Sequence, residues 1–234
     1  MKTSRPARGS RRRAAIFELL DIMARLRGPG GCPWDRQQDH RSLRFHAVEE
    51  VYELLDAIEA GDDQLLLEEL GDLLLQVIFH AQLAHERGAF DFEAVARHLA
   101  DKLIGRHPHV FASAKVKSVE AVWAQWDKIK RAEKAGTPHE RVSALDGIPK
   151  HLPALLRAEK LVKKARKAGL LAPQPPMDRY RTRRQLGRAL FELVAEAQRR
   201  GWCAEDLLRA EVQRQEQALR RQEQRIAKTG SAAT

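Results

Sequence analysis

Four acidic side chains in the first third of the chain have the spacing of a metal site. The run E-E-V-Y-E contains Glu50 and Glu53, and after fifteen more residues E-L-G-D contains Glu69 and Asp72. Residues three apart lie on one face of a helix, so each pair would present two carboxylates together. Two such helices packed antiparallel would bring all four acids to one point. A buried acidic cluster is costly unless it is protonated or neutralised by a cation, so the pattern predicts a bound hard metal ion.

A di-iron carboxylate site is an alternative interpretation of the same acids. Di-iron bundles use Glu-x-x-His pairs among their ligands. Neither acidic pair has this form, and His80 and His85 follow Glu69 on the same predicted helix but outside its pair. The spacing therefore gives little support to a di-iron site.

The elements that would position these acids are helices. Apolar residues recur at helical spacing along most of the chain, and alternating β-branched runs are short, so we expect an all-α helical bundle. The first pair lies on a predicted helix at 43–60, and the second on a predicted helix at 64–86 that is apolar almost all round. Such a helix must be covered within a bundle or by a second subunit, and Gly71 suggests close approach of another helix. The apolar stripe that helix 43–60 is expected to bury consists of Val48, Val51, Tyr52, Leu55 and Ile58.

Three further places carry residues that could contact a substrate. Lys102 and Arg106 are four apart on one predicted helix, and Trp126 and Lys130 are four apart on another. Solvated basic faces explain such pairs equally well, but a nearby acidic metal site favours phosphate binding. Trp34 follows a Gly-Pro-Gly-Gly turn, where it could be a core residue or a wall against which a base stacks.

The second half resembles the first without its acids. Residues 68–76 read E-E-L-G-D-L-L-L-Q, and residues 184–192 read R-Q-L-G-R-A-L-F-E. Gln185 and Arg188 stand where Glu69 and Asp72 stand in the first half. Because no glutamate lies between Glu159 and Glu192, the second half cannot supply the other acidic pair either. We therefore expect a degenerate repeat that holds no metal.

Composition limits the location and the partners of the protein. The net charge is +10, but it is concentrated in residues 1–13, with six basic and no acidic side chains, and in residues 145–234, with 20 basic and ten acidic ones. A non-catalytic or regulatory protein that binds nucleic acid is therefore the alternative function, although aromatic residues are not interleaved with the basic ones. The chain has only two cysteines, which is typical of a reducing compartment. The basic N-terminal stretch is not followed by the apolar region of a signal peptide, and no long apolar run occurs, so we expect a cytoplasmic protein without a membrane segment.

The chain resembles the MazG family of all-α nucleoside triphosphate pyrophosphohydrolases. The acids match that family's EExxE and ExxD signature, and four further runs match in the same order: G-C-P-W-D, D-K-L-I-G-R-H-P-H-V-F, W-x-x-x-K and S-A-L-D-G-I-P. The similarity is close over residues 14–165 and weaker beyond. The resemblance implies a catalytic domain at 14–134, built as a four-helix unit, after a disordered basic tail at 1–13. A linker at 135–153 and the degenerate repeat at 154–234 would follow.

The same resemblance implies an activity and roles for individual residues. The activity is hydrolysis of a nucleoside triphosphate to the monophosphate and pyrophosphate by a homodimer, with Mg²⁺, or Mn²⁺ in its place, as the cofactor. The metal ligands would be Glu50, Glu53, Glu69 and Asp72, with Glu49 as an accessory acid. Lys102 and Arg106 would contact phosphates, and Trp126 with Lys130 would contact the nucleotide. Only the first half would hold an active site.

Overall fold

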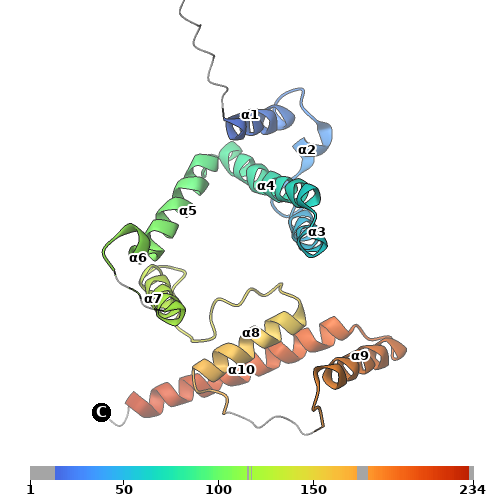
Figure 1. Ribbon diagram of the computed structural model, residues 1–234, viewed down its shortest axis with the longest axis vertical. Coiled ribbons are helices and arrows are strands. Elements are labelled where there is room, and N and C mark those ends of the chain that lie inside the picture. The colour runs from blue at the N-terminus through green and yellow to red at the C-terminus, as the bar shows by residue number, and fades with distance from the viewer. Residues whose placement is uncertain (1–13, 115, 117, 173–178, 232–234) are drawn as a thin grey trace, which may run out of the picture. The chain divides into compact units, whose positions relative to one another are not determined.

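The predicted all-α fold is confirmed. The computed structural model describes residues 14–114, 116, 118–172 and 179–231, and these residues form ten helices and no strand (Figure 1). The predicted disordered tail at 1–13 lies outside the described residues. The helices are α1 (Ala15–Arg27), α2 (Pro33–Gln37), α3 (His46–Ala60), α4 (Asp63–Glu86), α5 (Phe92–Arg106), α6 (Pro108–Phe111), α7 (Val119–Ala132), α8 (Ala154–Lys167), α9 (Arg183–Arg199) and α10 (Ala204–Ser231).

The chain divides into two compact units, Met1–Lys117 and Ser118–Thr234. Helices α1 to α6 belong to the first unit and α7 to α10 to the second. This division falls before α7, whereas the family resemblance suggests a catalytic domain that runs to residue 134. The functional boundary at 134 stays a prediction, and each unit is described by itself below.

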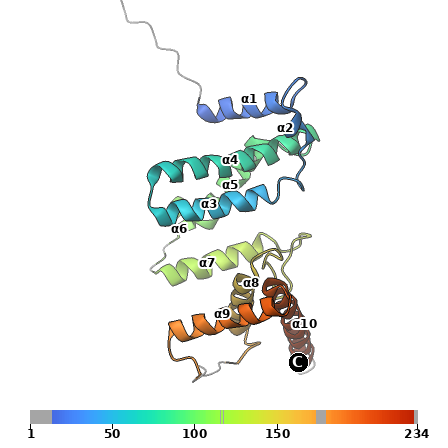
Figure 2. The ribbon, with the colours of Figure 1, turned by 90° about the vertical axis from the view of Figure 1, so that its right-hand side faces the viewer.

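Local sequence signals explain where the helices of the first unit begin and end. The Asp62 carboxylate accepts hydrogen bonds from the backbone N–H groups of Gln64 and Leu65, which caps α4. Gly61 ends α3 in the left-handed conformation that a glycine adopts without steric cost. The short Gly61-Asp62 connection folds α3 and α4 into an antiparallel hairpin (Figure 2). This hairpin carries the predicted metal ligands.

The hydrophobic core of the first unit lies at the C-terminal end of α4. Partly buried residues of α1 and α5 pack against it, and its buried members are Met23, Leu43, Ile78, Phe79 and Leu83. Helix α3 and the part of α4 before Ile78 contribute no residue to this core. The prediction that the stripe of α3 is buried is therefore wrong within one chain, because Val48, Val51, Tyr52, Leu55 and Ile58 are 43–55% exposed. Gly71 also has open space around it, so none of the helices that the structure describes makes the expected close approach there.

The second unit is organised around the long helix α10, which packs along α8 (Figure 1). Its core includes Leu145 from the loop before α8 and Leu161, Ala165, Leu170, Val212 and Leu219. The buried Arg157 of α8 donates to Glu216 of α10 at 2.6 Å and adds a charged contact between these helices. Helix α9 contacts α10 and leaves large apolar side chains exposed, among them Phe191 and Leu193.

No helix in the described part of the chain is both long and apolar enough to cross a membrane. Cys32 and Cys203 are free thiols.

Candidate metal centre

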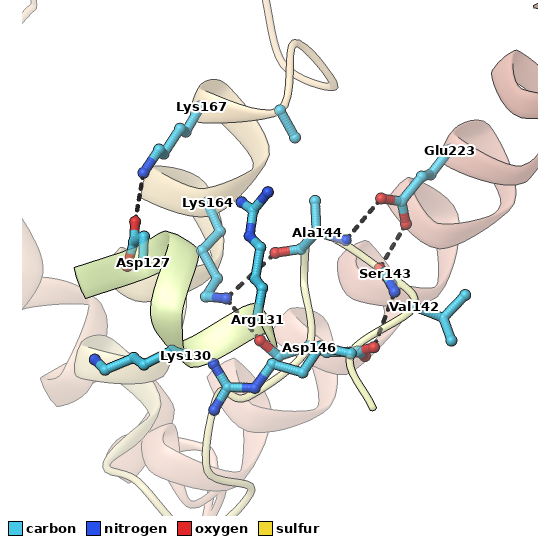
Figure 3. Close-up of a pocket in the computed structure, with 12 residues that line it drawn as sticks. Asp127, Lys130, Arg131, Val142, Ser143, Ala144, Asp146, Lys164, Lys167 and Glu223 are labelled. Atoms are coloured by element: carbon cyan, nitrogen blue, oxygen red, sulfur yellow. Dashed lines mark hydrogen bonds and ion pairs between the residues drawn. The ribbon is translucent and has the colours of Figure 1, made fainter. Parts of the chain in front are cut away.

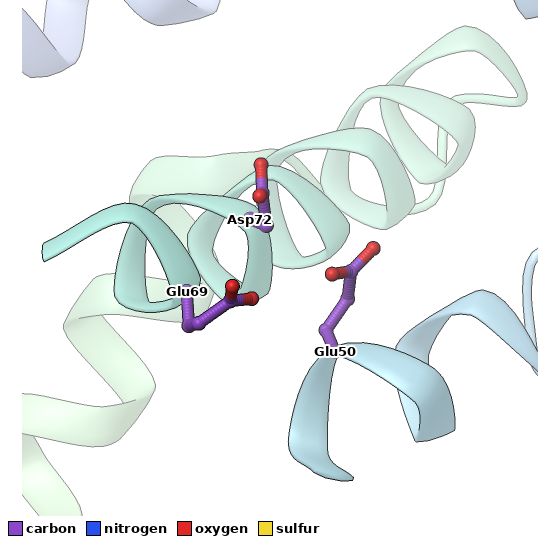
Figure 4. A group of neighbouring side chains, drawn as sticks. All are labelled: Glu50, Glu69 and Asp72. Carbon is purple, nitrogen blue, oxygen red and sulfur yellow. The ribbon is translucent and has the colours of Figure 1, made fainter. Parts of the chain in front are cut away.

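The α3–α4 hairpin brings three of the four predicted ligands together. Glu50 projects from α3, and Glu69 and Asp72 project from the neighbouring helix α4 (Figure 4). One carboxylate oxygen from each lies within 4.8 Å of those of the other two. All three side chains are partly buried. Three hard oxygen donors at this separation can hold a small divalent cation such as Mg²⁺.

The electrostatics of the cluster favour a bound cation. Burial raises the pKa of the Glu50 carboxyl above its usual value, and the charges of Asp72, Glu53 and Glu49 raise it further. Burial likewise raises the pKa of the Glu69 carboxyl, followed by the charges of Glu53 and Asp72. Since both shifts disfavour the ionised form, the cluster of carboxylates is destabilised in the absence of a positive partner.

One buried carboxylate oxygen of the cluster has no hydrogen-bond partner. The Oε2 atom of Glu69 is buried, and none of the described residues donates a hydrogen bond to it. The buried Gln76 donates from Nε2 to Oε1 of Glu50 at 3.2 Å. This bond fixes the Glu50 carboxylate but leaves Glu69 without a donor. A hard metal ion could satisfy the unpaired Glu69 oxygen, because such ions prefer carboxylate oxygens as ligands.

Gln76 belongs to this site although it is not one of the residues predicted from the sequence. It lies four residues after Asp72 and seven after Glu69, so it follows the acids along the same face of α4. A polar residue at this spacing on an otherwise apolar helix is the sequence feature that could have identified Gln76 as part of the site.

The other two predicted acids lie at the edge of the cluster. Glu53 is exposed and is not one of the three converging carboxylates, although its charge raises the pKa of both Glu50 and Glu69. Glu49 is exposed, and its Oε2 lies 3.6 Å from Nδ1 of His46. The roles of Glu53 as a fourth ligand and of Glu49 as an accessory acid therefore stay predictions.

The predicted phosphate contacts lie together on α5. Lys102 and Arg106 are both partly buried and occupy the last two turns of this helix. No carboxylate of the described residues pairs with Lys102, so its ammonium group is available to an anion.

Trp34 is not a core residue, because its side chain is 52% exposed. Its ring meets the ring of His46 edge-on, with the centroids 6.1 Å apart, near the start of α3. An exposed indole at this position is compatible with the stacking role that the sequence left open.

Trp126 and Lys130 contact each other on α7, in the second unit. The Lys130 ammonium lies over the Trp126 ring, 4.3 Å from its centroid, and Trp123 stacks against the same ring. This cation–π contact fixes the direction of Lys130. Their contact with a nucleotide stays a prediction.

Gln185 and Arg188 of α9, which the predicted repeat aligns with Glu69 and Asp72, have other partners. The Gln185 side chain accepts from backbone N–H groups at the start of α9 as part of a capping box with Thr182. Arg188 forms an ion pair with Glu192 one turn along the helix. Within the described ranges, a group of three possible metal ligands occurs only in the first unit.

Comparison with known proteins agrees with this geometry. The model of the MazG nucleotide pyrophosphohydrolase domain matches residues 38–111, which contain the acidic cluster and also Lys102 and Arg106 of α5. A nucleoside triphosphate pyrophosphohydrolase of Escherichia coli is 39% identical over 94% of this chain and 91% of its own length. A protein of Thermotoga maritima named nucleoside triphosphate pyrophosphohydrolase/pyrophosphatase MazG is 46% identical over 65% of this chain and 57% of its own.

A Mycobacterium tuberculosis nucleoside triphosphate pyrophosphohydrolase is 42% identical over 70% of this chain and 48% of its own length. The match to the E. coli protein extends through both units, so the similarity is not limited to the α3–α4 hairpin. The chain belongs to the MazG nucleotide pyrophosphohydrolase family.

Proposed function

We propose that the protein hydrolyses nucleoside triphosphates to the monophosphate and pyrophosphate in a Mg²⁺-dependent reaction at the α3–α4 hairpin. The observation that carries this proposal is the convergence of Glu50, Glu69 and Asp72 within 4.8 Å, with one buried Glu69 oxygen lacking a donor. Membership of the MazG family and the names of the relatives support the choice of reaction.

Each acid has a distinct part in the proposed site. Glu50, Glu69 and Asp72 would hold the metal, and Glu53 is placed to complete the set or to hold a water molecule. When bound, Mg²⁺, or Mn²⁺ in its place, supplies charge neutralisation for the phosphates and lowers the pKa of bound water. Gln76 fixes the Glu50 carboxylate in one orientation. Glu49 adds negative charge beside Glu50 and so strengthens the attraction for a cation.

The basic and aromatic residues would bind the substrate. Lys102 and Arg106 on α5 would offset charge on those phosphate oxygens that the metal does not reach. Lys130 and Trp126 would contact the nucleotide from α7, and the exposed Trp34 would stack on a base. Contacts of this kind select for a triphosphate more than for one particular base.

We propose one active site per chain and a homodimeric enzyme in the cytoplasm. Gln185 and Arg188 in place of acids support a degenerate second repeat, because neither side chain supplies a carboxylate to neutralise a divalent ion. Exposed apolar faces on α3 and α4 support a second copy as their cover. The two free thiols support a reducing compartment.

Pyrophosphate release from a panel of nucleoside triphosphates, with Mg²⁺ and with EDTA, tests the proposal. We expect release only with the divalent ion, and a loss of at least about 100-fold in kcat/KM for Glu69→Gln, which removes a ligand charge while keeping the shape. Glu59→Gln is the matched control, because Glu59 is an exposed residue of α3 outside the cluster. Full activity in Glu69→Gln, or no release from any nucleotide, would reject the proposal.

A further inference from the structure

The second unit contains a cavity of about 580 Å³ that the proposed reaction does not use as a whole. It lies between α7, the loop at 141–146, α8 and α10 (Figure 3). Its volume is within the range of about 300 to 1,000 Å³ that is common for pockets binding small molecules. The charged residues of its wall are five basic and three acidic ones: Lys130, Arg131, Arg141, Lys164, Lys167, Asp127, Asp146 and Glu223.

All three acids of the wall already have protein partners. Asp127 pairs with Lys167 at 2.8 Å, and Asp146 accepts from Arg220 at 2.8 Å and from the Ser143 backbone at 2.9 Å. Glu223 accepts from the Ala144 backbone N–H at 2.8 Å and from the Ser143 hydroxyl at 2.5 Å (Figure 3). Their negative charge therefore holds the loop and the helices in place and is only partly available to the other cations of the wall.

The remaining cations of the wall are crowded and poorly neutralised. The partly buried Lys164 donates to the backbone carbonyls of Asp146 at 2.6 Å and Ala144 at 3.2 Å, which are neutral acceptors. No carboxylate of the described residues pairs with Arg131 or Arg141. Burial and the charge of Arg141 hold the pKa of the Lys164 ammonium below its usual value. Like charges gathered in a concave wall create a field that attracts anions.

The backbone beneath Arg141 is shaped to let this side chain lie along the wall. Gly147 has a φ of +85°, which favours glycine, and a methyl group added there would overlap the Arg141 guanidinium. The guanidinium of Arg141 therefore rests against bare backbone, and its planar donors can make bidentate contacts with an anion in the cavity.

We infer that this cavity binds the phosphate chain of an anion, either free pyrophosphate or the phosphate tail of a nucleotide, between Arg131, Arg141 and Lys164. Two guanidinium groups and one ammonium group match the several oxygens and charges of linked phosphates better than those of a single orthophosphate. The inference does not depend on the proposed hydrolysis, because it concerns metal-free binding by the second unit.

Calorimetric titration of the full chain in EDTA tests this inference. Pyrophosphate, a non-hydrolysable nucleoside triphosphate and orthophosphate are titrated separately. We expect pyrophosphate, the nucleoside triphosphate analogue or both to bind, with orthophosphate at least about tenfold weaker because it offers fewer oxygens. Binding by the nucleotide but not by pyrophosphate would identify the nucleotide tail as the ligand. Equal binding of orthophosphate would overturn the assignment to a phosphate chain, and absence of binding by all three would overturn the site.

Matched variants locate the binding. Arg131→Gln with Arg141→Gln should weaken binding at least about tenfold, whereas Arg131→Lys with Arg141→Lys should recover part of the affinity. The control is Arg221→Gln with Arg225→Gln, which removes the same charge from exposed positions of α10 outside the cavity. Equal weakening in the control would overturn the site. Glu69→Gln should leave binding in EDTA unchanged, so a failure of hydrolysis and a failure of this inference are read separately.

Discussion

Gln76 connects the two halves of the metal centre at the scale of single residues. It lies on α4 with the proposed ligands Glu69 and Asp72, yet its Nε2 donates to Glu50 on α3 at 3.2 Å. It is only 7% exposed, so water cannot easily replace it. Gln76→Met keeps the volume and removes the bond. We expect the affinity for Mg²⁺ to fall by about 10-fold to 100-fold, as for other residues that orient metal ligands.

The measurement is activity against Mg²⁺ concentration. The apparent metal affinity should fall more than kcat at saturating metal, because Gln76 orients a ligand and does not itself react. The control is Gln64→Met in the exposed first turn of α4. An unchanged Mg²⁺ requirement in Gln76→Met would show that the bond to Glu50 is not needed for binding.

The raised pKa values of Glu50 and Glu69 predict how stability depends on pH without metal. Both carboxyls have a pKa above the usual 4.5, so the folded state binds these protons more tightly than the unfolded chain. The free energy of unfolding should therefore fall as the pH rises from about 4.5 through the raised values. Glu69→Gln removes part of this repulsion and should unfold at a higher temperature than the unsubstituted protein in EDTA at pH 8.

With Mg²⁺ bound, the unsubstituted protein should unfold at a higher temperature than Glu69→Gln. At 100 times its Kd, a bound ion adds about 2.7 kcal/mol to the free energy of unfolding of the unsubstituted protein, and Glu69→Gln should gain much less. Thermal unfolding at several pH values, with EDTA and with Mg²⁺, measures both effects, with Glu59→Gln as the control. A Glu69→Gln protein that is less stable than the original in EDTA at pH 8 would contradict the repulsion argument.

At the scale of elements, one arginine attaches α1 to the end of α4. The Arg27 side chain is 7% exposed, and its Nε and Nη2 donate to the two Glu86 oxygens at 2.7 Å each. It also donates to the backbone carbonyl of Gln38 and lies over the Phe79 ring in the core. The bonds to Arg27 lower the pKa of Glu86, so their stabilisation is present above the unfolded pKa and is lost as the pH falls through the folded one.

Arg27→Met should therefore loosen α1. Hydrogen bonds to charged groups contribute about 1.5 to 3 kcal/mol each, and Glu86 is 35% exposed, so we expect a loss of roughly 2 kcal/mol after screening by water. Hydrogen exchange of the α1 amides should then be about 30-fold faster, because 1.4 kcal/mol corresponds to a factor of ten. Arg25→Met is the control on the exposed side of α1. Equal hydrogen-exchange rates of the α1 amides in Arg27→Met and Arg25→Met would contradict this role of Arg27.

The helices themselves could be predicted because their signals are local. The apolar spacing of 64–86 and the capping side chain of Asp62 specify α4 to within a residue or two. The three converging acids could be predicted for the same reason, since spacing on α3 and α4 and one short turn suffice. The buried surface could not, because whether Leu55 is covered depends on what packs against α3 and not on its own helix.

At the scale of the whole molecule, the exposed apolar faces of α3 and α4 predict a homodimer. The five stripe residues of α3 face solvent in the single chain, and so do several residues of the N-terminal half of α4, among them Leu67 and Leu70. Burying one such side chain fully contributes about 1.5 to 3 kcal/mol, so several together supply enough free energy for a stable contact. This cover would also shield the acidic cluster on the same hairpin from water and strengthen its attraction for a metal.

Size-exclusion chromatography with light scattering tests this prediction. The unsubstituted protein should have twice the chain mass of 26.6 kDa at micromolar concentration. Leu55→Glu places an unpaired charge on the α3 face and should give monomers with weakened Mg²⁺ binding, because burying that charge costs several kcal/mol. Ile226→Glu, at an equally exposed apolar position near the end of α10, should remain dimeric. A monomeric unsubstituted protein would contradict the predicted homodimer. A dimeric Leu55→Glu protein would show that the dimer interface does not include this face of α3.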